Sequence, residues 1–410
     1  MLSSKSLDRK QWLILFLYFI LLPYGKSYIF SQLLIVILFI FNVKTIKNSF
    51  NQAEYTYKFL LLIFCLIWLP MLISLPDAIN LERSLLKTLG VLPLLLVGIT
   101  IVYLINNEIK REYIRLGVVF ITTLWCIDFL LFLNVTDPTV RTFFWEIHKL
   151  NSVNTRPLQG LVTAVLSPVI FETLREHTKS KKIALFTTII ATLHISTIIL
   201  SGNRNAVLMM AIGISLWGLY TLISYKYSWK KISICALIFI GVSVVIVNQL
   251  PTRLSTFNEL DSLDLKIVDK VSSGRLGLWE SAARMSLDHW FNGVGPRGFR
   301  YGYDEYRPAE GKYYSIYLHG STHPHFVLLE IFLETGIIGL ISIIVAICLL
   351  FYNLRTVPMP ARSAMFAWSL CVFLAIVPSI GKAFYSSYWL SLILYCIFMS
   401  ISHLNSKFER

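Results

Sequence analysis

The stretch from Phe59 to Leu75 reads FLLLIFCLIWLPMLISL and carries no charged residue. About 17 to 25 consecutive, mostly apolar residues are enough to cross the hydrocarbon core of a bilayer as a helix. A helix also satisfies its own backbone hydrogen bonds in lipid, which an isolated strand or loop does not. This stretch therefore predicts a membrane-spanning helix.

The same pattern recurs along the whole chain of 410 residues, which is 56% hydrophobic and 15% charged. In soluble proteins about a quarter of the residues are charged. These numbers exclude a soluble enzyme and a disordered chain, and they predict an all-α polytopic integral membrane protein with about twelve transmembrane helices. The predicted spans are residues 11–23, 28–43, 59–75, 85–105, 113–133, 159–174, 183–200, 206–224, 232–250, 336–352, 363–381 and 388–402.

The net charge of +14 is distributed unevenly over the loops. If the N-terminus is cytoplasmic, nineteen Lys and Arg lie on that side, and the short loops on the other side hold eight, among them Arg83, Lys87 and Lys382. Cytoplasmic loops of membrane proteins are enriched in Lys and Arg, so we expect both termini in the cytoplasm. Because topology explains most of the charge, we expect membrane lipids and no nucleic acid as partners.

Residues 251–325 form the one long stretch without a predicted span. The chain therefore divides into residues 1–250 with helices 1–9, a large external loop domain at 251–325 between helices 9 and 10, and residues 326–410 with helices 10–12 and a cytoplasmic tail. Long loops in compact proteins are usually functional. The nine basic residues of this loop include six Arg, whose planar fork suits phosphate or carboxylate ligands. Pairing with the loop's own nine acidic residues is the alternative.

Residues 272–280, SSGRLGLWE, predict the start of a helix that runs to about residue 290, because serines are available for capping and apolar residues follow at helical spacing. Arg275 and Trp279 lie four residues apart on one face and are candidates for lining a site. We expect Leu276 and Leu287 to pack against the membrane-facing body. An interfacial anchor is the alternative role for Trp279.

Two further external segments offer cations beside exposed backbone. The Gly-rich turn at residues 293–298 presents backbone N–H groups to an anion and places Arg297 in the turn, with Arg300 just after it. The short loop at residues 201–205 places Arg204 at the membrane edge, where the topology rule gives no reason for it. A snorkelling side chain is the alternative role for Arg204.

The loop ends in Thr-His-Pro-His at residues 322–325. Histidine exchanges protons near neutral pH, and Pro324 sets a bend that presents His325 at the membrane surface. We therefore assign a catalytic role to His325 and keep His323 as a weaker candidate. Glu330 and Glu334 follow inside an apolar run, where a functional role and a helix-pairing role are equally open.

All six cysteines fall inside predicted spans, and neither a zinc-type Cys/His spacing nor a Gly-rich, Lys-containing phosphate loop is present. We therefore expect no metal site and no cofactor.

The end of the loop resembles the signature of O-antigen ligases, in which a His is followed by one polar residue, nine of any kind, Gly, two of any kind, and Gly. His325, Gly336 and Gly339 fit this spacing, and Phe326 departs from the polar residue. The segments around Arg204 and Arg275 and the glycine turn at 293–295 are also similar to the family's. The resemblance extends over essentially the whole chain and concerns the superfamily of O-antigen ligases, polymerases and bacterial O-oligosaccharyltransferases.

The resemblance implies a metal-independent, inverting glycosyltransferase of the Gram-negative inner membrane. Such an enzyme transfers O-antigen from undecaprenyl diphosphate to lipid A-core at the periplasmic face. In this chain His325 is the expected base, with Arg275 as its catalytic partner, and Arg204, Arg275 and Arg297 are expected to bind the diphosphate.

Two other functions stay open at this point. An O-antigen polymerase would use the same type of donor with a different acceptor, although the position of the large loop and the spacing after His325 favour a ligase. A lipid-linked glycan flippase or transporter would also contain about twelve spans. Transporters often show repeated halves and polar residues at the membrane midplane, which this sequence does not show.

Overall fold

The computed structural model describes residues 11–24, 26–131, 155–178, 180–225, 265–272, 274–309, 311–313 and 321–407. Every regular element within these residues is a helix, and they contain no β-strand. The predicted all-α class is therefore confirmed. Each predicted span falls on a helix except the one at residues 232–250, which lies outside the described residues.

The helices fall into two runs along the chain. The first run comprises η1 (Gln11–Ile14), α2 (Leu15–Leu21), α3 (Tyr28–Gln52), α4 (Glu54–Ile73), α5 (Leu81–Val91), α6 (Pro93–Leu104), α7 (Glu108–Leu131), α8 (Thr155–His177), α9 (Lys181–Leu200) and α10 (Arg204–Ser224). The second comprises α13 (Leu265–Val271), α14 (Leu276–Asp288), α15 (Phe299–Tyr306), α16 (Val327–Tyr352), η2 (Asn353–Thr356), α17 (Ala361–Ile376), α18 (Ser387–Ser402) and η3 (His403–Lys407).

Eight helices of the described chain are long and apolar enough to cross a membrane, where α5 and α6 count as one. Two shorter apolar helices, Gln11–Leu21 and Ala361–Ile376, accompany them. The chain is thus a multi-pass helical membrane protein, and a total of about twelve spans stays a prediction.

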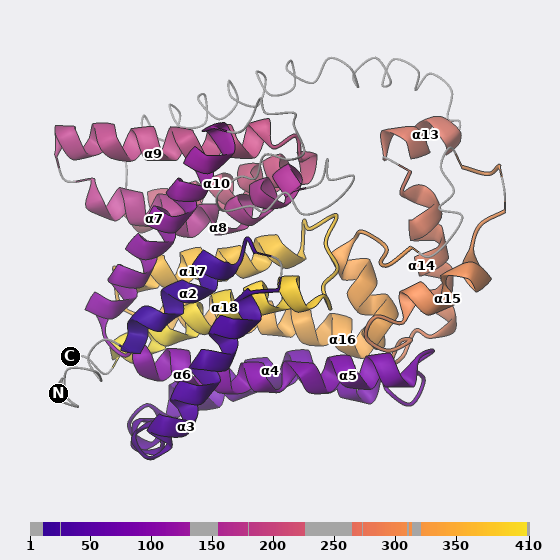
Figure 1. Ribbon diagram of the computed structural model, residues 1–410, viewed down its shortest axis with the longest axis horizontal. Coiled ribbons are helices and arrows are strands. Elements are labelled where there is room, and N and C mark those ends of the chain that lie inside the picture. Colours follow the sequence, from indigo (N-terminus) through magenta and orange to yellow (C-terminus); the bar gives the residue numbers. More distant parts are fainter. Residues whose placement is uncertain are drawn as a thin grey trace.

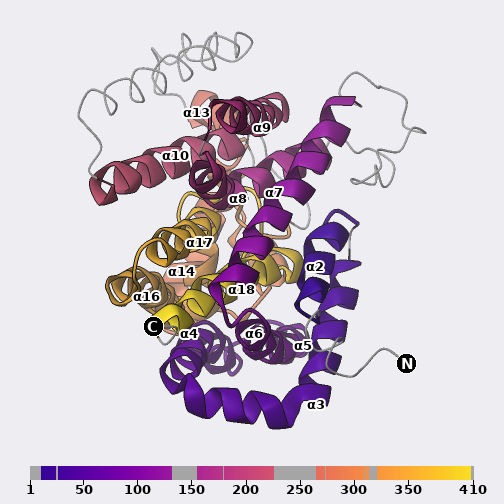
Figure 2. The ribbon, with the colours of Figure 1, turned by 90° about the vertical axis from the view of Figure 1, so that its left-hand side faces the viewer.

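The helices surround a buried centre formed by α17 and α18. These two helices run through the middle of the molecule, with α8, α9 and α10 on one side and α3, α4, α5 and α6 on the other (Figures 1 and 2). Every residue of α18 from Trp389 to Ser402 is buried. By contrast, Phe41 on α3 is 81% exposed. Apolar residues on the outer helices therefore face the lipid, and those of α18 pack against protein.

Several predicted spans have different bounds in the structure; the span at 28–43, for example, continues to Gln52. The span at 85–105 begins earlier, at Leu81, and α5 meets α6 at Pro93, which has no N–H to continue the backbone ladder. The span at 336–352 begins at Val327, because Glu330 and Glu334 are buried in its first turns although their charge marked them as its edge. The span at 363–381 ends at Ile376.

The helices α13, α14 and α15 lie together at one end of the molecule (Figure 1), where α14 and α15 pack against α16. Ser272 accepts a hydrogen bond from the backbone N–H of Arg275 at 3.2 Å, as expected for a serine near a helix start. The side chain of Asp269, which the sequence did not single out, accepts from the N–H of Leu276 at 2.9 Å. These two contacts fix the chain direction at Arg275.

The buried face of α14 differs from the predicted one. Leu278, Ala282 and Met285 form a small apolar core with residues of α15 and with Leu333 of α16. Leu287 is 70% exposed, so the prediction that it packs inward is wrong. Small residues on α14, such as Ala282, allow the helix to approach α16 closely, and this burial overrides the pattern of large apolar residues.

The turn after α14 docks on a kink within α16. Gly336 has φ 64°, and the helix bends there. The N–H of Val294 donates to the carbonyl of Leu333 at 3.0 Å, and the N–H of Ile337 donates to the carbonyl of Trp290 at 2.8 Å. A Cβ at Gly336 would lie 2.1 Å from the carbonyl oxygen of Phe291. Only glycine permits both the positive φ and this backbone contact.

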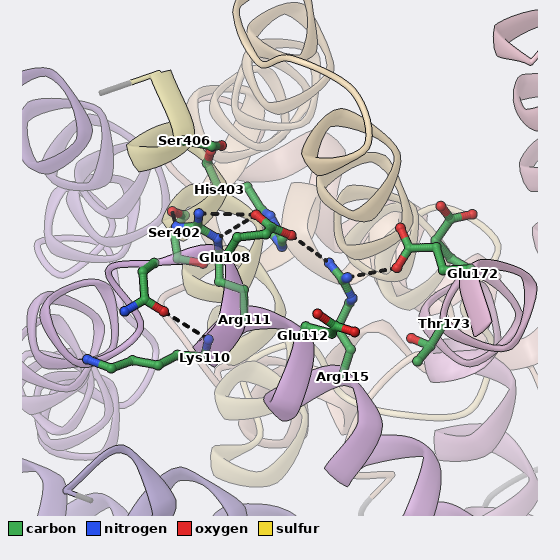
Figure 3. Close-up of polar contacts among 12 residues, drawn as sticks. Glu108, Lys110, Arg111, Glu112, Arg115, Glu172, Thr173, Ser402, His403 and Ser406 are labelled. Carbon is green, nitrogen blue, oxygen red and sulfur yellow. Dashed lines mark hydrogen bonds and ion pairs between the residues drawn. The ribbon is translucent and has the colours of Figure 1, made fainter. Parts of the chain in front are cut away.

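A charged network joins α7, α8 and the C-terminal helices (Figure 3). Arg111, almost fully buried, donates to Glu108 on its own helix and to the backbone carbonyl of Ser402 at 3.2 Å. Arg115 pairs with Glu176 of α8 at 2.8 Å. Buried charges are stable only when they are paired and hydrogen-bonded, so this network fixes the packing of α7 against α8 and α18.

The docked turn gives a first prediction. We expect Gly336→Ala to lower the midpoint of thermal unfolding in detergent, because the new Cβ meets the carbonyl of Phe291 and the positive φ costs about 1–3 kcal/mol. Gly218→Ala on α10 is the matched control, since nothing lies within 4 Å of a Cβ there. Equal unfolding midpoints for both variants would contradict this account of the kink.

Candidate active site

His325 and Arg297 share an unusual backbone conformation. Their φ angles are 58° and 70°, and they are the two non-glycine residues with positive φ in the described parts of the chain. Such strain persists where the surrounding structure enforces it, and it concentrates at active sites and ligand sites. The two residues thus mark one region, where the end of the large loop meets the turn after α14.

The two loop histidines lie against each other. The ring centroids of His323 and His325 are 3.9 Å apart. Nδ1 of His323 lies 2.9 Å from the hydroxyl of Thr322. The backbone of Gly381 also contacts His323. Among the described residues, the buried Nδ1 of His325 has no hydrogen-bond partner, so no protein group occupies this ring nitrogen.

Both histidines are neutral at pH 7. Burial, followed by the charges of Arg275 and Lys382, lowers the pKa of His325 from 6.5 to about 4. Burial, followed by His325 and Arg297, lowers the pKa of His323 to about 3. Both pKa values are lowered because an apolar and positively charged environment disfavours the charged imidazolium. His325 is consequently in the form that accepts a proton.

The structure brings several cations to this region. Arg275, at the start of α14, and Lys382, between α17 and α18, both act on His325. Arg297 acts on His323 and also on Arg300, whose pKa is lowered by burial and then by that neighbouring charge. Cations that stay together at the cost of mutual repulsion, in a partly buried place, form a strong site for an anion.

Lys87 adds a cation from a different part of the chain. Its ammonium donates to the hydroxyl of Ser387 at 3.1 Å, across 300 residues of sequence. The side chain also lies close enough to Arg297 and Glu334 to interact electrostatically with both. Lys87 thus reaches the same cluster from α5.

The predicted site residues differ in how firmly the structure connects them. His323, His325, Arg275 and Arg297 are brought together, with Arg300 beside Arg297. Trp279 packs near Phe326, with ring centroids 6.4 Å apart. Arg204 is the first residue of α10, where its side chain is exposed, and its share in the site stays a prediction.

Sequence analysis missed Lys87 and Lys382 as members of the site. Both were counted among the eight basic residues that the topology places on the outer side. The positive-inside rule gives no reason for a lysine there, and that was the available signal. Only the three-dimensional structure shows which of these eight basic residues lie near the histidines.

Metal ligands do not gather in the described parts of the chain. No group of three or more His, Cys, Asp or Glu side chains there is arranged to hold an ion. The expectation of a reaction without metal stays a prediction, because this observation concerns the described residues alone.

The electrostatic coupling of Lys382 to His325 gives a second prediction. We expect Lys382→Met to raise the pKa of His325 above about 4, because the substitution removes one positive charge. The measurement is the rate of carbethoxylation of His325 by diethyl pyrocarbonate as a function of pH, since only the neutral ring reacts. Lys181→Met, which removes a charge at the start of α9, is the control. An unchanged titration midpoint in Lys382→Met would show that this charge does not act on His325.

Comparison with known proteins finds a similarity to one family over part of the chain. Residues 189–344 match the family described as O-Antigen ligase. This range includes Arg204, Arg275, Arg297 and His325. A search of curated proteins found no matching relative. The family supports a glycosyltransferase-like function of the O-antigen ligase and polymerase type in lipopolysaccharide biosynthesis, with lipid-linked glycans as substrates. Over residues 189–344 the chain is therefore similar to the O-antigen ligase family, and its helical, multi-pass fold is consistent with that similarity.

Proposed function

We propose that this protein is an inverting, metal-independent O-antigen ligase. It transfers O-antigen polysaccharide from undecaprenyl diphosphate to the lipid A-core oligosaccharide, at the periplasmic face of the Gram-negative inner membrane, with both termini in the cytoplasm. The observation that carries the proposal is a neutral His325 beside several cations in one partly buried site. A neutral imidazole suits removal of a proton, and the cations suit a diphosphate.

The proposed reaction is a single displacement at the anomeric carbon. A hydroxyl oxygen of the acceptor attacks this carbon from the face opposite the diphosphate, so the new glycosidic bond has inverted configuration. The bond between the carbon and the diphosphate oxygen breaks, and undecaprenyl diphosphate leaves with the electron pair. His325 takes the proton of the attacking hydroxyl.

The cations act on the leaving group. Negative charge develops on the diphosphate as its bond to the sugar breaks, and fixed donors in a partly dry site stabilise that charge strongly. Arg275 and Arg297 are the primary candidates, and Arg204 is a third. The structure adds Lys87 and Lys382 to these candidates. Arginine offers two parallel donors to a phosphate, whereas lysine offers a point charge.

Donor binding also improves the base. A pKa of about 4 makes His325 available at pH 7 but weak. The negative charge of a bound diphosphate compensates Arg275 and Lys382, so the pKa of His325 rises toward its ordinary value. A base whose pKa lies nearer the working pH is more effective. His325 thus becomes a better base only when the donor is in place.

Transfer by variants provides the third prediction. We expect His325→Ala to abolish transfer, because no other base replaces the ring, and Arg275→Lys to recover little, because a point charge does not replace the fork. The measurement uses purified protein, a synthetic lipid-linked diphosphate donor and rough lipopolysaccharide. His289→Ala, in the same loop domain, is the control and retains transfer. Ligation at the wild-type rate by His325→Ala would remove the base assignment.

The products in cells separate a ligase from a polymerase, and this is the fourth prediction. We expect the gene to restore O-antigen on lipid A-core in a strain that lacks its own ligase. Restoration of no glycan on lipid A-core, together with altered glycan chain length, would identify a polymerase instead. The spacing after His325 and the position of the loop support the ligase.

A lipid-linked glycan transporter is the alternative from another class. It would move glycan across the membrane of proteoliposomes without forming a new glycosidic bond. Transfer by purified protein without ATP or an ion gradient supports the enzyme, and glycan movement without transfer refutes it.

A further inference from the structure

Two buried carboxylates lie beside the cations of the site and have no part in the reaction described above. Glu330 and Glu334 are four residues apart on α16, so they lie on one face of the helix. Both side chains are fully buried. Two acidic side chains in such a place are costly unless each has a specific polar partner. Their partners therefore indicate why they are there.

Glu334 holds the backbone of Arg297. Its Oε2 accepts the N–H of Arg297, the residue with φ 70°. Arg297 lies within a tight turn, since the N–H of Gly298 donates to the carbonyl of Gly295 at 2.9 Å. A left-handed non-glycine residue needs a compensating contact, and the carboxylate provides one. Glu334 thus fixes the point from which the Arg297 side chain starts.

Glu330 holds the segment before α18. Its Oε2 accepts the N–H of Phe384 at 3.0 Å, and its Oε1 lies 3.4 Å from the N–H of Tyr385. This segment also carries Lys382, whose charge acts on both histidines. One carboxylate therefore ties the Lys382 segment to the helix that begins just after His325.

Glu330 also faces the Arg297 guanidinium without binding it fully. Nη1 of Arg297 lies 4.0 Å from Oε1 of Glu330, which is an ion pair but exceeds hydrogen-bond distance. This Nη1 is buried and has no hydrogen-bond partner among the described residues. The side chain is 19% exposed, so its charge is held near the site with an unused donor. Glu330 thus holds the guanidinium by one nitrogen, while the exposed part of the side chain stays at the site.

From these contacts we propose that Glu330 and Glu334 are positioning residues, which hold Arg297 and the Lys382 segment around His325 so that the Arg297 guanidinium meets the donor diphosphate. The inference rests on the proposed function, because it names the diphosphate as the anion. Neither glutamate touches the substrate. Glu334 acts through the backbone of Arg297, and Glu330 acts through the Arg297 side chain and through the Lys382 segment.

The fifth prediction is a double-mutant cycle between Glu330 and Arg297. We expect Glu330→Gln to lower kcat/KM for the lipid-linked donor by about tenfold or more, as is typical for coupled charged neighbours. In an Arg297→Met background the same change has a smaller further effect, because only the contact of Glu330 with the Lys382 segment is then left to lose. We expect Glu334→Gln to behave in the same way. If the two substitutions acted independently, the fold-changes in kcat/KM of the single variants would multiply in the double variant.

The matched control is Glu172→Gln. Glu172 is also fully buried and pairs with an arginine, Arg175, at 2.6 Å, but it lies on α8 in the charged network. We expect this variant to lower the midpoint of thermal unfolding without changing KM for the donor. This control distinguishes the general effect of losing a buried ion pair, which lowers stability, from the loss of positioning that we expect in Glu330→Gln.

A second measurement keeps the inference distinct from the proposed function. If wild-type protein transfers no glycan, the proposed function fails, and the cycle is repeated with the Kd for undecaprenyl diphosphate. Non-additive losses of affinity in that cycle support the positioning role on their own. If Glu330→Gln weakens binding or transfer by the same factor in both backgrounds, Glu330 does not act through Arg297 and the inference is wrong.

Discussion

The structure of the site depends on one backbone contact, between the turn after α14 and the kink of α16 at Gly336. The N–H groups of Val294 and Ile337 donate across this contact in opposite directions. No side chain fits between the two segments, since a Cβ at Gly336 would lie 2.1 Å from a carbonyl oxygen. This contact sets how far Arg297, on the turn, lies from His325, just before α16. The spacing between His325 and Gly336 in the sequence thus corresponds to the distance along α16 from the histidine to this contact.

Electrostatics follow from that geometry. Several cations and two neutral imidazoles share a partly buried space, beside two buried acidic side chains of α16. The arrangement disfavours the imidazolium and favours a multiply charged anion, because both effects come from the same positive field. The charged network of α7 and α8 is different, since Arg111 and Arg115 there are matched by acids and a backbone carbonyl (Figure 3).

Much of the fold was predictable because apolar runs report directly on the bilayer. The spans over α3, α4, α7, α9 and α10 were located from hydropathy to within a few residues at most of their ends. The predictions were wrong where a polar residue is buried or a large apolar residue is exposed. Because of Glu330 and Glu334, hydropathy placed the start of the α16 span too late. These side chains are buried in the first turns of the helix, where hydrogen bonds from distant segments stabilise them, and no local pattern shows such contacts. Leu287 was placed on the buried face of α14 for the opposite reason, because small residues define that face.

The sequence by itself determined that this is a helical membrane protein, and it predicted a site that includes His325 and Arg275. Lipid imposes continuous apolar runs, and the family spacing is local, so both can be read along the chain. Only the tertiary structure decided which cations accompany these residues. Lys87 and Lys382 come from segments almost 300 residues apart and meet the site through helix packing. The positive field at His325 is therefore a property of the assembled helices, and no single segment contains it.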